Sequence, residues 1–265
     1  MEIKVMSFNL RLHVDSDGEN AWPNRVQAAA TLIKKYDPLI IGTQEGFYAM
    51  LEDLMASTSG YAWIGEGRYG ANQDEHNAIL YKQDELLVIE QGQFWLSEHP
   101  ETPASMGWDA SHPRICTWAQ FQHMLQPELK FNVYNTHLDH SGEIARINGA
   151  TMILEHIQHR YRRDRLPFLL MGDFNSEPDS PVITYLRAQQ GLLTDCYSVI
   201  DNYAGGTFHQ FQGGADCPRI DYIFVSSAIS ARRMDVITGQ VDRRYPSDHY
   251  PVLAEIELEL DENVL

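Results

Sequence analysis

One short stretch limits what this chain can fold into more than any other, and it ends in Gly172-Asp173-Phe174-Asn175. The residues before it, 167–170, read Pro-Phe-Leu-Leu and are too few and too apolar for a helix, which predicts a buried central strand. In an extended backbone, residues two apart point to the same side, so Asp173 and Asn175 would lie together at the strand end. A buried carboxylate is costly unless a cation or hydrogen-bond donors meet it. An Asx-type turn before a helix starting near Glu177 also explains the pattern.

The same polar ending recurs on other predicted strands of the chain. The residues concerned are Asn9, Glu45, His137, Asp139, Asp221, Asp248 and His249. Each one alone fits a turn, a helix start or a satisfied core histidine. Placed together at one rim of a domain, they would form a concave cluster of amide, carboxylate and imidazole groups.

The remaining pattern predicts a single domain over residues 1–260, with a frayed tail over 261–265. Helices are expected to open at Pro23, after Glu45, over residues 143–161 and over residues 180–190. Further short strands alternate between apolar and polar residues and are joined by turns, as antiparallel pairs are. Two packed sheets with helices outside them would bury so many strands in one domain.

Charge and cysteine usage narrow the class of partner. The 265 residues carry 20 Lys plus Arg and 37 Asp plus Glu, a formal net charge of -17, which disfavours stable binding to duplex DNA or to anionic membranes. A small anionic substrate is still compatible, because a metal or local arginines can reverse the sign inside a cleft. Three scattered cysteines, no apolar run of membrane-spanning length and a start that leads directly into a strand predict a cytoplasmic protein.

The cluster suits phosphate chemistry assisted by a metal. Oxygen ligands without cysteine favour Mg²⁺ or Mn²⁺, and the chain lacks the HExxH pattern of many zinc enzymes. Such an ion can polarise a phosphoryl oxygen. A histidine paired with a carboxylate can orient or activate water, and arginines can hold the phosphate.

Six motifs, in this order along the chain, resemble those of the endonuclease/exonuclease/phosphatase family, which is deoxyribonuclease I-like. They are Ser7-Phe8-Asn9, Thr43-Gln44-Glu45, Asn135-Thr136-His137-Leu138, Gly172-Asp173-Phe174-Asn175, Arg219-Ile220-Asp221-Tyr222 and Ser247-Asp248-His249-Tyr250-Pro251-Val252. Any one motif is weak, whereas the ordered set spans nearly the whole chain. Segments around Trp22, Trp108 and Arg114 are similar to a bacterial branch of stand-alone members.

The resemblance implies a four-layer α/β/β/α sandwich of two mostly antiparallel sheets flanked by helices. It also implies hydrolysis of phosphate esters that depends on Mg²⁺. Glu45 would be the principal metal ligand, with Asn9 and Asp248 close by, and Asp173 would orient the nucleophilic water and contact phosphate or a second metal. The number of metal ions is left open.

The remaining roles also follow from the resemblance. His249, paired with Asp221, would be the general base or a phosphate-stabilising group, and Asp173 competes with it for the role of base. Asn175 would orient water or contact phosphate, and His137 would bind a phosphate oxygen or assist the leaving group. Arg114 and Arg25 are candidates for further phosphate contacts, although each would fit a structural ion pair equally well.

The sequence therefore predicts a phosphodiesterase or phosphatase acting on a small or nucleotide-like phosphate ester. A nuclease acting on DNA or RNA ends is the alternative among enzymes. A non-catalytic binding module that kept the fold is the alternative outside enzymes, and it would be expected to lack at least one of the ligands. The sequence leaves the oligomeric state open.

Overall fold

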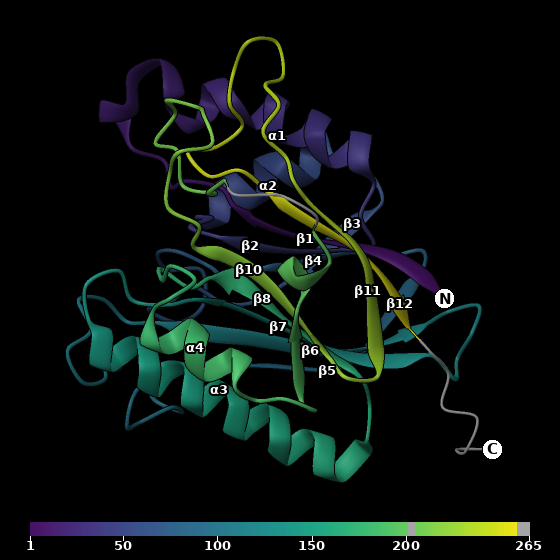
Figure 1. The fold of residues 1–265 in the computed structure, drawn as a ribbon. Coiled ribbons are helices and arrows are strands. Elements are labelled where there is room, and N and C mark those ends of the chain that lie inside the picture. The colour runs from purple at the N-terminus through teal and green to yellow at the C-terminus, as the bar shows by residue number, and fades with distance from the viewer. Residues whose placement is uncertain (201–204, 259–265) are drawn as a thin grey trace.

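The computed structural model describes residues 1–200 and 205–258. Two six-stranded sheets pack face to face, with α1 and α2 outside one sheet and α3 and α4 outside the other (Figure 1). The four-layer α/β/β/α sandwich is therefore confirmed. The predicted frayed tail lies outside the described residues.

The first sheet has the strand order β11-β12-β1-β2-β4-β3. Its strands are β1 (Glu2–Asn9), β2 (Ile40–Gln44), β3 (Tyr61–Ile64), β4 (Ile79–Lys82), β11 (Ile229–Val236) and β12 (Val252–Leu258). A short 3-10 helix (Asp15–Asn20) precedes α1 (Trp22–Tyr36), and α2 is Tyr48–Ser57. Only β1 and β2 pair in parallel among the described strands of this sheet, since α1 connects them as a crossover.

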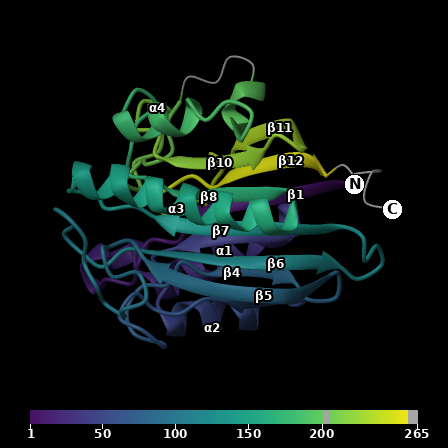
Figure 2. The ribbon, with the colours of Figure 1, turned by 90° about the horizontal axis from the view of Figure 1, so that it is seen from below.

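The second sheet has the strand order β5-β6-β7-β8-β10-β9. Its strands are β5 (Leu86–Trp95), β6 (Ile115–His123), β7 (Lys130–His137), β8 (Phe168–Asp173), β9 (Leu193–Asp195) and β10 (Asp221–Ser226). The helices on its outer face are α3 (Glu143–Asp164) and α4 (Pro181–Arg187), and a 3-10 turn covers Cys196–Val199. Here α3 connects the parallel strands β7 and β8 and runs along the sheet (Figure 2).

The core has a dry layer under each pair of helices and a third between the sheets. On β1, Met6 and Phe8 face α1 and α2, whereas Ile3 and Val5 face the second sheet, as alternation along a strand requires. The middle layer also contains polar groups. Asn135 of β7 donates from Nδ2 to the carbonyls of Thr43 and Ala78 at 2.8 and 2.9 Å, and its Oδ1 accepts from Gln44 Nε2 at 2.7 Å. This buried amide therefore fastens the two sheets to each other in one register.

Strand register brings the polar strand ends to one edge of the sandwich. His137 and Asp173 are partners in the parallel β7–β8 pair, and Asp221 is opposite Asp173 in the antiparallel β8–β10 pair. In the first sheet, Asn9 ends β1 beside the end of β2, and residue 252 begins β12 opposite Ser7. The segment just before β12, with Asp248 and His249, therefore reaches the same rim. Within the described residues, no helix is long and apolar enough to cross a membrane.

Candidate active site

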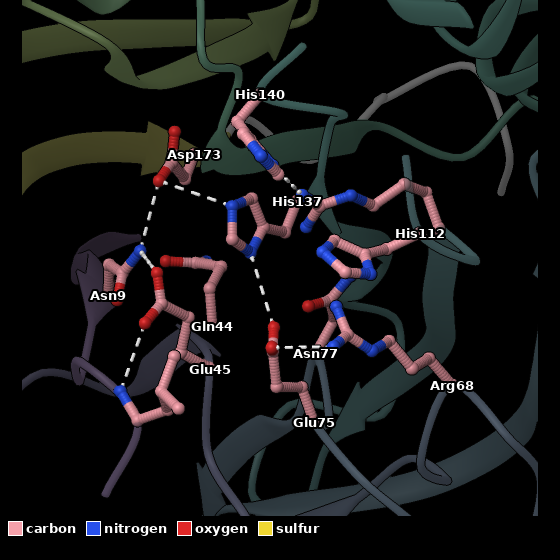
Figure 3. A network of polar contacts seen from close by, with 12 residues as sticks. Asn9, Gln44, Glu45, Arg68, Glu75, Asn77, His112, His137, His140 and Asp173 are labelled. Carbon is pink, nitrogen blue, oxygen red and sulfur yellow. Dashed lines mark hydrogen bonds and ion pairs between the residues drawn. The ribbon is translucent and has the colours of Figure 1, made fainter. Parts of the chain in front are cut away.

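Two carboxylates and an amide meet across the gap between the sheets. Asn9 Nδ2 donates to Glu45 Oε1 and to Asp173 Oδ2, both at 2.9 Å (Figure 3). The Asn9 amide is held in place because its Oδ1 accepts from the backbone N–H of Arg11 at 2.9 Å. The second oxygen of Glu45 accepts from the backbone N–H of Leu12 at 2.9 Å. The structure therefore brings three of the four predicted metal ligands together.

Asp221, His249 and Asp173 form a second buried group. Asp221 Oδ2 lies 2.9 Å from His249 Nδ1, and His249 Nε2 faces Asp173 Oδ2 at 3.8 Å. Burial and the nearby Asp221 raise the pKa of Asp173 to about 7. Burial disfavours a charged imidazole, yet the surrounding carboxylates raise the pKa of His249 well above its usual value. In this arrangement His249 is a cation at neutral pH and can donate a hydrogen bond from Nε2.

Asp248, the fourth predicted metal ligand, lies at the edge of this group. Its Oδ2 is 3.8 Å from Arg11 Nε, and its Oδ1 accepts from Ser247 Oγ at 3.3 Å. Burial and the charge of Glu45 raise its pKa, while His249 and Arg11 oppose that change. Asp248 lies close enough to Glu45 for their charges to interact. Among the described residues, however, it is in neither group of potential ligands whose atoms all lie within 4.8 Å of one another.

His137 approaches the same oxygen of Asp173 as His249 does. Its Nε2 is 2.9 Å from Asn175 Nδ2 and 3.5 Å from Asp173 Oδ2. The Asn175 Nδ2 also donates to the carbonyl of Leu138, so it presents hydrogen atoms toward His137 and Nε2 must accept. Burial, followed by the charges of Arg114 and His249, keeps the pKa of His137 well below its usual value. His137 is therefore neutral and carries its proton on Nδ1.

That Nδ1 faces Glu75, a residue that the sequence patterns did not identify. Glu75 Oε2 lies 3.9 Å from His137 Nδ1, and Glu75 Oε1 is paired with Arg68 Nη2 at 2.9 Å (Figure 3). Burial raises the pKa of Glu75 to about 7, although Arg68 lowers it. Both residues lie in a polar loop between β3 and β4 without periodicity, and in sequence they look like solvated loop residues.

Arg114, a predicted phosphate contact, lies near this pair, between Asp139 and His140. Its Nε is 3.3 Å from Asp139 Oδ2, and its Nη2 is 3.0 Å from His140 Nδ1. The His112 and His140 rings face each other with centroids 5.6 Å apart. Asp139 also accepts hydrogen bonds from the backbone N–H groups of Ser111, Ser141 and Gly142, and these bonds hold its carboxylate in place beside Arg114. These bonds, with Arg114, hold the pKa of Asp139 below its usual range despite its burial.

Arg25, the other predicted phosphate contact, has a different role. Its side chain is fully buried, and its N–H groups donate to the backbone carbonyls of residues 10, 11, 20 and 246. Four of its five N–H donors are bound to main-chain carbonyls, which favours a structural role over the predicted phosphate contact. A helix-start arginine has the same sequence context whether it turns outward or inward onto carbonyl oxygens.

The residues present fit a divalent cation. Ligand atoms of Glu45, His137 and Asp173 lie within 4.8 Å of one another. Asp173 is buried against a second carboxylate, which disfavours its ionisation, and a bound cation would supply the missing opposite charge. Carboxylate oxygens are the donors that hard cations such as Mg²⁺ or Mn²⁺ prefer, and no thiolate is present in this group.

The chain is similar to known proteins over almost its whole length. The model of the endonuclease/exonuclease/phosphatase family matches residues 6–249. A Bacteroides thetaiotaomicron protein of that family is 36% identical, with a TM-score of 0.92 and coverage of 99% of this chain and 97% of that one. The mannosyl-6-phosphatase Bt3783 of the same organism is also 36% identical, with a TM-score of 0.90 and coverage of 97% and 100%. No curated protein matches the chain.

More distant structures share the fold alone. The human nocturnin catalytic domain with bound sulfate is 19% identical, with a TM-score of 0.77 over 97% of this chain and 94% of that one. The resemblance of the six motifs and its bacterial branch are confirmed, because the match spans nearly the whole chain. The protein therefore belongs to the endonuclease/exonuclease/phosphatase family and is a phosphoesterase by membership.

Proposed function

We propose that the protein is a hydrolase of small phosphate esters that depends on Mg²⁺ or Mn²⁺, and that phosphomonoesters are its preferred substrates. The observation that carries the proposal is the joint approach of Asn9, Glu45 and Asp173, with two histidines beside Asp173. Glu45 and Asp173 would hold the metal ion, with His137 beside it and Asp248 at its edge. The ion would polarise the phosphoryl oxygen and neutralise developing charge.

The side chains around the proposed metal site would have separate roles in the reaction. His249, kept protonated by Asp221, donates to a phosphoryl oxygen and steadies the charge that develops there. Asp173, 3.8 Å from His249 Nε2, would orient the attacking water or take a proton from it. His137 accepts at Nε2 from Asn175, and the two together place a hydrogen-bonding edge against the phosphate.

Two arginines lie near the site of this acidic chain. The net charge of the protein is -17, and both arginines are paired with carboxylates, Arg68 with Asp74 and Glu75 and Arg114 with Asp139. The acidic chain disfavours long polyanions as substrates. The mannosyl-6-phosphatase, at 36% identity over nearly all of both chains, favours a phosphomonoester over a nucleic-acid end.

The test is a panel of phosphomonoesters, phosphodiesters and single-stranded oligonucleotides assayed with Mg²⁺, with Mn²⁺ and with EDTA. We expect Mg²⁺- or Mn²⁺-dependent release of phosphate from small monoesters. Glu45→Ala should lower kcat at least about a hundredfold with unchanged thermal stability, since the ion loses a ligand. Glu155→Ala, on the exposed face of α3, is the matched control. Full activity of Glu45→Ala, or full activity in EDTA, would refute the proposal.

A further inference from the structure

An open cavity of about 480 Å³ adjoins the catalytic group. Its lining comes from α3, from the segment after β8, and from the loop before β10: Arg146, Asn175, Ser176, Glu177, Ser180, Phe208, Pro218 and Ile220. Asn175 belongs at once to this lining and to the contact with His137. A volume of this size suits a small ligand. The cavity therefore lies next to the position proposed for the scissile phosphate.

Two polar groups of the lining have unused hydrogen-bonding capacity. Ser176 is 4% exposed, and its Oγ has no hydrogen-bond partner among the described residues. Arg146 is fixed by one bond, from Nη1 to the carbonyl of Asp139 at 2.9 Å, and makes no second bond to a described residue. A buried hydroxyl without a partner is costly unless something binds to it. These groups are what a ligand carrying several hydroxyls would use.

Phe208 joins the cavity to the reaction centre. Its ring lies against the His249 imidazole, with centroids 4.8 Å apart and planes at 39°. Phe208 is half-buried and, with Pro218 and Ile220, supplies an apolar part of the lining. An aromatic face beside hydroxyl, guanidinium and carboxylate groups matches a ring with C–H groups on its face and hydroxyls around its edge.

We propose that this cavity binds the alcohol portion of the substrate and selects a polyhydroxylated, sugar-like group. The proposal rests on the function proposed above and names the part of the substrate that the cavity recognises. Glu177, exposed at the cavity, accepts hydrogen bonds from hydroxyls and repels a further phosphate. The cavity therefore favours a sugar monophosphate over a polyphosphate or a continuing nucleic-acid strand.

The test uses mannose 6-phosphate and glucose 6-phosphate against p-nitrophenyl phosphate, which lacks hydroxyls on its ring. Binding of the two sugar phosphates is measured by calorimetry in EDTA, where turnover is not required, and kcat and KM are measured with Mg²⁺. The variants are Arg146→Gln and Ser176→Ala. Arg162→Gln, an exposed arginine further along the same helix, is the matched control. Because the Ser176 hydroxyl has no protein partner, Ser176→Ala should fold as the wild type does.

We expect Arg146→Gln to weaken sugar-phosphate binding about tenfold, and Ser176→Ala severalfold, the loss of one hydrogen bond each. The ratio of kcat/KM for sugar phosphate to that for p-nitrophenyl phosphate should fall by the same factors, mainly through KM, while Arg162→Gln changes neither. Wild-type affinity in both variants, equal losses on both kinds of ester, or no binding of sugar phosphate to the wild type would overturn the proposal. Intact, variant-sensitive binding without hydrolysis of any ester would instead reject only the proposed function.

Discussion

Replacing Arg25 with Met distinguishes a structural arginine from a phosphate-binding one. The guanidinium donates to the carbonyls of Leu10 and Pro246 at 2.7 Å and of Arg11 at 2.9 Å, and also to the carbonyl of Asn20. Met fills most of the volume of the side chain but offers no donor. The four carbonyls then lose their partner inside the protein.

The magnitude follows from these bonds. Each of the four buried acceptors left without a partner costs about 1–3 kcal/mol. We take about 3–5 kcal/mol, because water can reach some of the carbonyls after the change. For a chain of this size, that free energy corresponds to a fall in Tm of roughly 6–20 °C. Burial lowers the pKa of Arg25 only to about 10, so its guanidinium is charged at neutral pH, and the substitution by Met removes all of these bonds.

The assay is thermal unfolding, followed by kinetics at a temperature where Arg25→Met is folded. Because Leu10 follows Asn9 and Pro246 precedes Asp248 by two residues, loosening them should lower kcat about tenfold or more through misplacement of the site. Arg233→Met, an exposed arginine on β11, is the control and should unfold within about 0.5 kcal/mol of the wild type. An unchanged Tm together with a raised KM for phosphate esters would refute the structural role and restore the phosphate contact.

Three further changes test the packing that supports the site. Burial and the charge of Arg160 lower the pKa of His156 to about 4, so between about pH 6.5 and pH 4 this residue binds fewer protons in the folded protein than in the unfolded chain. The free energy of unfolding should therefore fall by roughly 3 kcal/mol on acidification through that window. His156→Gln should flatten this part of the stability profile. Asn135→Ala should cost about 2–4 kcal/mol, since two carbonyls and an amide lose their partners between the sheets. Gly172→Ala should cost at least about 2 kcal/mol, because its Cβ would meet the Thr136 carbonyl oxygen at 2.0 Å.

Denaturant unfolding measures all three effects. An acid limb of the stability profile that is unchanged in His156→Gln would contradict the first expectation. Unfolding midpoints equal to that of the wild type in Asn135→Ala or Gly172→Ala would contradict the other two. The last would show that β7 and β8 can separate beside His137 and Asp173 at no cost.

Much of the fold follows from local patterns. The short apolar segment over residues 167–170 predicted β8, which ends three residues later at Asp173, because buried strands need apolar side chains on both faces. The helix predicted over residues 180–190 ends at Arg187, three residues early. Its start was sound because Ser180 accepts from the Ile183 N–H as a cap.

The site was predictable only where it lies at strand ends. Asn9, Glu45, His137, Asp173 and Asp221 meet as the motifs indicated, since each is tied to a strand in the sheet. Groups carried by loops had no such signal. Glu75, Arg68 and Arg146 reach the site through loop and helix geometry, and Arg25 turned inward onto carbonyls instead. The cytoplasmic location, the single domain over residues 1–260, the binding of metal by Asp248 and the substrate contact of Arg114 stay predictions.

The most direct test of the central claim is Mn²⁺ binding followed by electron paramagnetic resonance. The claim is that Asn9, Glu45 and Asp173 converge to hold a divalent cation beside a phosphate. We expect the wild type to bind Mn²⁺ and Glu45→Gln and Asp173→Asn each to weaken that binding at least about tenfold, with the fold intact by circular dichroism. Equal Mn²⁺ affinity in the wild type and in both variants would contradict the account.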